Sequence, residues 1–267
     1  MSLVKLFAFP EARALAYRTA ALLGVALANS EMEEFPDGEG RLRSDEAVDG
    51  SDVVVFAALD GRARSPAEKL CLLAFFVHSL RDLGARSVTV VAPYLAYARS
   101  DRRVVPFDPL CLKATATMLE SVGMSRILVI DAHNPAAFEN AFRYAVAETL
   151  EAFSLFSGPL STELEKNTPL VVLAPDLGGV KRAESFRKAL SRELQREIGF
   201  AFLEKHRRHE FVGLKGGAEL EESEVLIIDD MISTGETILR ALEACRRGGA
   251  KCASVMATHG QIGRAYV

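Results

Sequence analysis

A short apolar run that ends on two carboxylates limits the possible folds of this chain more than any other feature. Residues 225–228 are all apolar, and Asp229 and Asp230 follow them directly. An apolar run of this length predicts a strand that is buried on both faces. Such strands occur in parallel sheets covered by helices, and ligands of these sheets bind at the carboxyl ends of the strands. The two acids therefore lie where a ligand is expected.

The same alternation of a short apolar run with a longer helical stretch fills the rest of the chain. In the first half, strands are predicted at residues 3–9, 52–58, 87–92 and 126–130, with helices at 11–23, 65–83, 110–122 and 135–142. In the second half, strands are predicted at 170–174, 200–204, 225–228 and 251–257, with helices at 180–190 and 238–247. Repeated strand–helix units predict an α/β fold with mostly parallel sheets flanked by helices.

Two such sets of units in one chain predict two similar domains. The pattern is most polar and least regular between residues 145 and 167, and we place the boundary there. The predicted domains are residues 1–148 and 149–267, and a chain of 267 residues is long enough for both.

The composition favours a cytoplasmic globular protein. Apolar residues make up 49% of the chain, charged residues 25%, and the net charge is −4, which argues against nucleic acid or a membrane surface as a partner. No apolar run approaches the roughly 18 residues that a membrane span needs, and the N-terminus lacks a secretory signal pattern. The four cysteines show no Cys-x-x-Cys spacing, which predicts reduced and mostly buried thiols.

A hydroxyl-rich loop follows the two acids and leads into the predicted helix at 238–247. It contains Ser233, Thr234, Gly235 and Thr237. Hydroxyls and backbone N–H groups at the start of a helix form an anion site, while adjacent carboxylates suit sugar hydroxyls, Mg²⁺ or both. These residues could instead be turn and N-cap residues only. That alternative explains the acid pair, the hydroxyls and the glycine together less well.

An aromatic ring and two acids surround a glycine turn in the first half of the chain. Phe35, Asp37 and Glu39 lie within a few residues of Gly38. Taken alone, the segment is compatible with any exposed turn.

Arginines and a histidine follow two predicted strands of the first half. Arg99 and Arg102 come after the strand at 87–92, and His133 follows the strand at 126–130 beside an acid. Ligands of a parallel sheet gather at such strand ends, and guanidinium groups match the geometry of phosphate oxygens. A basic surface loop and a structural histidine are the alternatives.

Two further candidates lie in the second half. Asp176 follows the strand at 170–174 and precedes two glycines, whose backbone amides can closely approach an anion. Lys205 and Arg207 precede a stretch with glycines at 213, 216 and 217, which suits a loop that closes over a transferring phosphoryl group. A solvated run of charges is the alternative for these two residues.

Several of these motifs carry a resemblance to known families. The loop at 229–237 resembles the ribose-phosphate loop of the type I phosphoribosyltransferase fold, which phosphoribosyltransferases share with ribose-phosphate pyrophosphokinases. The segments at 35–39, 92–102, 131–133, 176–183 and 205–207 resemble motifs of the pyrophosphokinases, in the same order along the chain. Phosphoribosyltransferases do not need the first of these segments, so the resemblance favours the pyrophosphokinases.

The resemblance implies an activity: transfer of the diphosphoryl group of ATP to the anomeric hydroxyl of ribose 5-phosphate, with release of AMP. It implies Mg²⁺ as the cofactor. In that family the aromatic loop reaches the ATP site of a neighbouring subunit, so the resemblance also implies a homo-oligomer, either a dimer or a hexamer. A phosphoribosyltransferase and a non-catalytic regulatory homologue remain the alternatives.

The resemblance also implies a role for each candidate residue. Ribose 5-phosphate would bind Asp229, Asp230, Ser233, Thr234, Gly235 and Thr237. ATP would bind Phe35, Asp37, Glu39, Arg99 and Arg102. The catalytic residues would be Lys205, Arg207 and His133, and the metal ligands His133 and Asp176.

This chain departs from the family pattern at two of the motifs. Ser100 stands where the family usually has glutamine, and Glu236 stands where its loop usually has glycine. A carboxylate at position 236 is expected to repel a phosphate bound in the loop.

Overall fold

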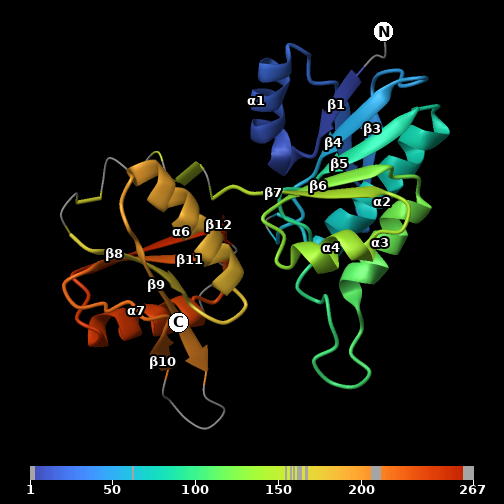
Figure 1. Cartoon of the computed structure of the whole chain (residues 1–267). Coiled ribbons are helices and arrows are strands. Elements are labelled where there is room, and N and C mark those ends of the chain that lie inside the picture. Colours follow the sequence, from blue (N-terminus) through green and yellow to red (C-terminus); the bar gives the residue numbers. More distant parts are fainter. Residues whose placement is uncertain are drawn as a thin grey trace. The chain divides into compact units, whose positions relative to one another are not determined.

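Short parallel strands form two separate sheets, each flanked by helices (Figure 1). The computed structural model describes residues 4–61, 63–153, 155, 156, 158, 160, 164, 165, 168–205 and 212–260, with the backbone alone at 205 and 212–214. The chain divides into two units, Met1–Leu150 and Glu151–Val267. The predicted α/β class with two mostly parallel sheets is confirmed. The sequence-based boundary after residue 148 lies close to this division.

The sheet of the N-terminal unit is parallel throughout, with the strand order β1-β4-β5-β6-β7. Its strands are β1 (Val4–Ala8), β4 (Asp52–Phe56), β5 (Ser87–Val91), β6 (Arg126–Ile130) and β7 (Val146–Leu150). The helices are α1 (Arg13–Leu23), α2 (Pro66–Asp82), α3 (Cys111–Ser121) and α4 (Pro135–Ala141), and the 3-10 helix η1 (Pro10–Ala12) precedes α1.

The two faces of this sheet belong to different cores because successive residues of a strand point in opposite directions. Leu6 and Ala8 pack with the alanines of α1, whereas Phe7 packs with Phe76 of α2. The helix α1 thus covers one face, and α2 contributes to the core of the other.

The sheet of the C-terminal unit has the order β10-β9-β8-β11-β12 and is parallel except for β10. The strands are β8 (Leu170–Ala174), β9 (Gly199–Lys205), β10 (Val212–Lys215), β11 (Glu224–Ile232) and β12 (Cys252–Gly260), and the helices are α6 (Val180–Leu194) and α7 (Glu236–Arg247). Leu226 and Ile228 of β11 pack in the core of α6, whereas Val225 and Ile227 pack in the core of α7. The apolar run is therefore buried on both faces, as the sequence predicts.

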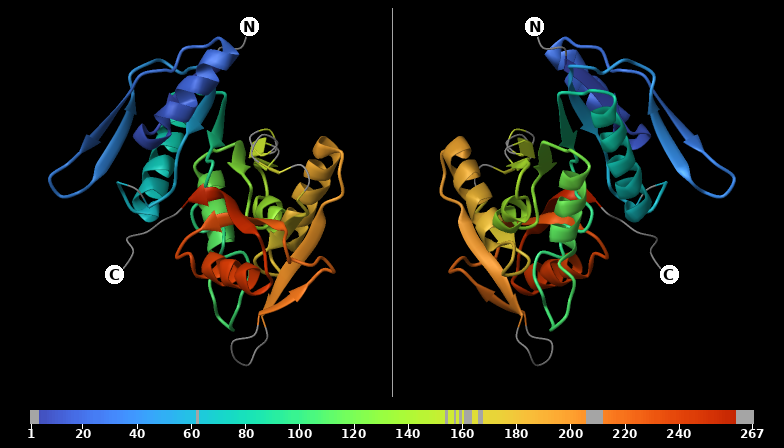
Figure 2. Two further views of the ribbon diagram at one scale, coloured as in Figure 1. Left: turned by 90° about the vertical axis from the view of Figure 1, so that its left-hand side faces the viewer. Right: turned by 90° about the vertical axis from the view of Figure 1, so that its right-hand side faces the viewer.

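Four strands have no counterpart in the sequence-based prediction. A hairpin joins β2 (Ser30–Glu34) to β3 (Gly40–Ser44), and it extends beside α2 (Figure 2). These strands carry charges at alternate positions and form no apolar run. The edge strand β7 lies in the polar segment that we assigned to the domain boundary, and the edge strand β10 lies in the predicted flap.

The predicted state of the cysteines is only partly correct. All four are free, but only Cys245 is buried; Cys111 is partly exposed, and Cys71 and Cys252 are exposed. The expectation of mostly buried thiols is therefore wrong. Within the described residues, no helix is both long and apolar enough to cross a membrane.

A buried lysine holds two loops at the carboxyl edge of the N-terminal sheet. Lys69 of α2 is fully buried, and its ammonium lies 3.0 Å from a carboxylate oxygen of Asp60 and 3.3 Å from one of Glu11. Glu11 follows β1 and Asp60 follows β4. A single cation in the interior thus compensates the charges at the ends of two neighbouring strands.

Replacing this lysine is expected to destabilise the N-terminal unit strongly. Lys69→Met leaves two carboxylates without their buried cation, and such a loss costs about 3 kcal/mol of unfolding free energy. Arg126→Met is the control, because Arg126 forms a 3.5 Å pair with Glu148 in which both side chains are well exposed, and it should cost less than about 1 kcal/mol. Urea denaturation measures both changes, and equal effects would contradict the buried role of Lys69.

Candidate active site

The acid pair lies inside a strand rather than after it. Pairing with β12 continues past the apolar run, with Asp229 opposite Ala257 and Ile232 opposite Gly260. This corrects the prediction that the strand ends at residue 228. The reason is that the neighbouring strand β12 is itself longer than predicted and supplies backbone partners beyond the acids.

The two acids of the pair have different surroundings. Asp230 is buried, and its Oδ1 accepts a hydrogen bond of 3.2 Å from Arg182 of α6. Asp229 is partly exposed, and its Oδ1 accepts a hydrogen bond of 2.9 Å from the backbone N–H of Asp230. Among the described residues, the guanidinium of Arg182 therefore lies beside the carboxylate of Asp230. The pair therefore presents Asp229 outward and anchors Asp230 inward.

The environment of Asp229 favours its neutral form. Burial raises the pKa of Asp229 to about 7, and the hydrogen bond and negative charge of Asp230 act in the same direction. The charge of Asp176 adds a smaller effect of the same sign. Three carboxylates thus interact at the carboxyl edge of this sheet, and a bound cation or a hydroxyl donor would relieve their repulsion.

Asp176 is held at this edge by the start of α6. It lies two residues beyond β8, the strand that neighbours β11, and its side chain is exposed. Its Oδ1 accepts a hydrogen bond of 3.0 Å from the backbone N–H of Gly179, the N-cap residue of α6. The double glycine therefore fixes the acid itself, rather than serving only as the anion site that we predicted from the sequence.

The hydroxyl loop leads from the end of β11 into α7. Ser233 and Thr234 are exposed, and Gly235 forms the N-cap of α7 with φ of +82°, a conformation that favours glycine. Thr237 lies in the first turn of the helix and is partly exposed. The first N–H groups of a helix have no partner within the helix. Hydroxyls and backbone donors therefore meet at one helix N-terminus, which is suited to a phosphate.

Glu236 is compensated within its own helix. Its carboxylate accepts a hydrogen bond of 2.8 Å from Arg240, one turn further along α7, and its side chain is 70% exposed. The expected repulsion of a bound phosphate is thus reduced by an adjacent cation and by solvent screening.

The predicted flap begins at the same edge of the sheet. In the register of β8 and β9, Ala174 lies opposite Phe202, so Lys205 at the end of β9 is three residues further toward the edge that carries Asp176. The side chain of Lys205 lies outside the described part of the structure, as does the whole of Arg207.

In the N-terminal unit, the tip of the β2–β3 hairpin carries Phe35, Asp37 and Glu39. The turn is closed by hydrogen bonds from Phe35 N to Glu39 O (2.8 Å) and from Gly38 N to Phe35 O (2.9 Å). The Asp37 carboxylate accepts a hydrogen bond of 3.1 Å from Glu39 N, and both acids are exposed. The segment is thus an ordered hairpin tip.

The arginine loop and the histidine loop lie together at the carboxyl edge of the N-terminal sheet. Ile130 N donates to Pro93 O at 3.0 Å, and the Asn134 amide donates to Asp101 at 2.7 Å. Arg99 and His133 lie between these two links in their loops, and Arg102 directly follows Asp101; all three are exposed. The structure therefore places on one edge the two arginines and the histidine that the sequence analysis selected separately.

Ser100 has a structural contact of its own. Its hydroxyl lies 3.0 Å from Pro109 O, to which it donates, and 3.4 Å from Cys111 N, from which it accepts. The side chain at this departure from the family pattern therefore closes the loop onto the start of α3.

One residue of the site was not selected from the sequence. Arg182 lies in the first turns of α6, and only its contact with Asp230 reveals its part in the acid cluster. The sequence contains a signal for this residue, because Arg182 belongs to the segment 176–183, which resembles a family motif.

Comparisons with known proteins show which families the two halves of the chain match. The family described as the N-terminal domain of ribose phosphate pyrophosphokinase matches residues 4–123, and the phosphoribosyl transferase domain matches residues 157–266. Ribose-phosphate pyrophosphokinases of Mycoplasmopsis pulmonis and Vibrio cholerae are 31% and 34% identical, covering 98% and 96% of this chain and 78% and 79% of the relatives.

A solved structure gives the same result. The phosphoribosylpyrophosphate synthetase from Mycobacterium smegmatis superimposes with a TM-score of 0.86 at 27% identity, over 98% of this chain and 83% of that one. The two domain models match the two halves of the chain, and the named pyrophosphokinases match nearly its whole length. This chain therefore belongs to the ribose-phosphate pyrophosphokinase family.

Proposed function

We propose that this protein transfers the diphosphoryl group of ATP to the anomeric hydroxyl of ribose 5-phosphate, giving phosphoribosyl pyrophosphate and AMP. The observation that carries the proposal is the arrangement of the C-terminal unit, where the acid pair of β11 leads directly into the hydroxyl loop at the start of α7. Acids that suit sugar hydroxyls and a helix N-terminus that suits a phosphate match the two ends of ribose 5-phosphate. Membership of the family supports the reaction.

The sugar phosphate would be held at two points. Ser233, Thr234, Gly235 and Thr237 would bind the 5-phosphate, since their hydroxyls and amides lie at a helix N-terminus. Asp229 and Asp230 would orient the ribose hydroxyls. Because Asp230 is fixed by Arg182, it would serve as the rigid member of the pair.

The nucleotide would be held by residues of the N-terminal unit. Arg99, Arg102 and His133 share one sheet edge and would bind the triphosphate. The hairpin tip with Phe35, Asp37 and Glu39 would bind the adenine of a neighbouring subunit, which requires a homo-oligomer, either a dimer or a hexamer. We place this activity in the cytoplasm.

Mg²⁺ would be bound mainly by the substrate. Among the described residues, no three His, Cys, Asp or Glu side chains form a ready metal site. This fits Mg²⁺, which commonly uses one or two protein ligands together with phosphates and water. Asp176 of the C-terminal unit would offer exposed carboxylate oxygens for this purpose, and His133 of the N-terminal unit would offer an imidazole nitrogen. The cation would neutralise charge on the phosphates.

Catalysis of this reaction consists largely of positioning and charge stabilisation. The anomeric hydroxyl would attack the β-phosphorus in line, and AMP would leave. Lys205 and Arg207 would stabilise the charge of the moving diphosphoryl group. The proposal is supported by the backbone position of Lys205, which ends β9 at the sheet edge that carries Asp176.

A non-catalytic regulatory homologue is the second candidate, and the departures at Ser100 and Glu236 favour it. The first assay mixes purified protein with Mg-ATP and ribose 5-phosphate and measures AMP; nucleotide binding and consumption of phosphoribosyl pyrophosphate with a base are measured beside it. We expect AMP in step with phosphoribosyl pyrophosphate. Nucleotide binding without AMP release would support the regulatory homologue, and consumption of phosphoribosyl pyrophosphate with a base would indicate a phosphoribosyltransferase.

Removing the flap lysine should reduce turnover sharply. Lys205→Ala is expected to lower kcat by about 10²–10³-fold, as for other positioned charge stabilisers, because its charge would act on the transferring group. Lys215→Ala is the matched control, since Lys215 is an exposed lysine at the other end of the β9–β10 pair. Steady-state AMP release measures both, and a nearly normal kcat for Lys205→Ala would remove this residue from the mechanism.

The acid pair should make the stability of the ligand-free protein dependent on pH. The pKa of Asp229 is raised to about 7 in the folded protein from an ordinary value of 3.8, so folding favours its protonated form. The contribution of Asp229 to the free energy of unfolding is therefore fully present below about pH 4 and is lost as the pH rises through 7.

Asp229→Asn should therefore flatten the stability curve between pH 4 and 8. At pH 8 the variant should be more stable than the natural protein by on the order of 1–3 kcal/mol, less than a full single-site shift would give, because the two acids titrate as a pair. Urea denaturation across this range is the measurement. Parallel curves for the two proteins would show that Asp229 is ionised throughout.

A further inference from the structure

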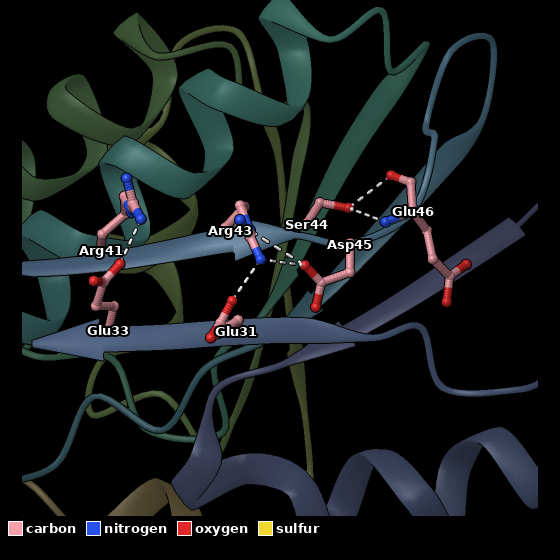
Figure 3. A network of polar contacts seen from close by, with 7 residues as sticks. All are labelled: Glu31, Glu33, Arg41, Arg43, Ser44, Asp45 and Glu46. Carbon is pink, nitrogen blue, oxygen red and sulfur yellow. Dashed lines mark hydrogen bonds and ion pairs between the residues drawn. The ribbon is translucent and has the colours of Figure 1, made fainter.

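The outer face of the β2–β3 hairpin is a ladder of ion pairs. Glu31 lies opposite Arg43 and Glu33 lies opposite Arg41 in the register of the two strands. Both arginines form ion pairs with the glutamates opposite them (Figure 3). All four side chains are substantially exposed. Because the residues of a strand alternate between faces, these pairs share one face.

The inner face of the hairpin is fixed to the body of the unit. Leu42 is buried in the core that includes α2, and Glu34 forms an ion pair with Arg64, which precedes α2. Gly40 allows a close approach, since a Cβ there would lie 3.0 Å from a Leu72 methyl. The outer face therefore has a defined orientation relative to α2.

The ladder ends on an aromatic ring. Phe35 continues the alternation of Glu31 and Glu33, and the Arg41 guanidinium carbon lies 5.5 Å from the centre of its ring. This separation is within the range of a cation–π contact. Arg41 is thus held on one side by Glu33 and stacks on the other side over Phe35. The ring is only partly exposed, although it lies at a projecting tip.

We propose that Arg41 is a positioning residue that holds the Phe35 ring in the orientation in which it receives a nucleotide base. The inference rests on the proposed function, because it assigns Phe35 to the base of ATP. With the guanidinium over one face, a planar base would stack on the other face of the ring. The cation also limits rotation of the phenyl side chain, so less motional freedom is lost when the base binds.

Arg43 provides a matched control for this role. Its side chain is 57% exposed, compared with 55% for Arg41. Like Arg41, it pairs with a glutamate of β2. It also contacts Asp45, at 3.1 Å, and forms the rung of the ladder further from the ring. Loss of either arginine weakens the ladder, but only loss of Arg41 removes the cation over Phe35.

The first experiment observes the ring without using activity. The chain contains no tryptophan, so Phe35→Trp introduces a single fluorescent reporter at the tip, and tryptophan is the strongest aromatic partner for a cation. Adding Arg41→Met should increase acrylamide quenching of the indole by about two- to fivefold and lower its anisotropy, as expected for loss of an exposed cation–π contact. Adding Arg43→Met should change neither.

The second experiment measures the consequence for the substrate. In the natural Phe35 background, Arg41→Met should raise KM for ATP by about two- to fivefold and leave KM for ribose 5-phosphate unchanged. Arg41→Lys should recover part of the loss, because an ammonium also binds an aromatic face. In a Phe35→Leu background, Arg41→Met should add no further increase, since the ring is absent.

These outcomes separate the inference from the proposed function. An indole that Arg41→Met does not affect overturns the positioning role, whatever the activity. Equal effects of Arg41→Met and Arg43→Met on KM for ATP also overturn it, because they would reflect the ladder as a whole. If the natural protein releases no AMP, the proposed function fails, while the fluorescence measurement still decides whether Arg41 holds the ring.

Discussion

Burial of β11 between two helical layers is the constraint on which the proposed ribose-phosphate site depends. Its apolar residues alternate between the cores of α6 and α7, so no face is left for a ligand, and chemistry is confined to the strand end. The same strand continues through Asp229 and Asp230, which places both acids on fixed backbone. The loop after the strand therefore starts from a fixed backbone position, and it leads directly into the N-terminus of α7.

The carboxylates at the carboxyl edges of the two sheets have different electrostatic surroundings. In the N-terminal unit, the acids after β1 and β4 share the buried Lys69, which closes this part of the edge with internal ion pairs. In the C-terminal unit, Arg182 contacts Asp230, while burial and the charges of Asp230 and Asp176 raise the pKa of Asp229. Repulsion among carboxylates favours the binding of a cation or of hydroxyl donors. Carboxylates that are already paired with a buried lysine stabilise the fold instead.

The parts of this structure that the sequence predicts are those with a strong local signal. Central strands such as β8 and β11 are apolar runs, and the loop from Ser233 to Thr237 has recognisable helix-start chemistry. Edge strands lack that signal: β7 exposes Val146 and Leu150, and half of the residues in the two hairpin strands are charged. The contact of Arg182 with Asp230 and the extension of β11 depend on neighbours distant in sequence, which a local pattern does not contain.

The hairpin shows why a charged ribbon can nevertheless hold a site residue. A two-stranded hairpin alone is marginally stable in water, and exposed ion pairs contribute little each. Here the inner face is anchored by Leu42 and by the pair of Arg64 with Glu34, so the outer pairs need only orient side chains that are already close. Arg41 is the member of that ladder in contact with Phe35. The inner face thus fixes the hairpin to the unit, and the ion pairs of the outer face hold Arg41 against the aromatic ring at the tip.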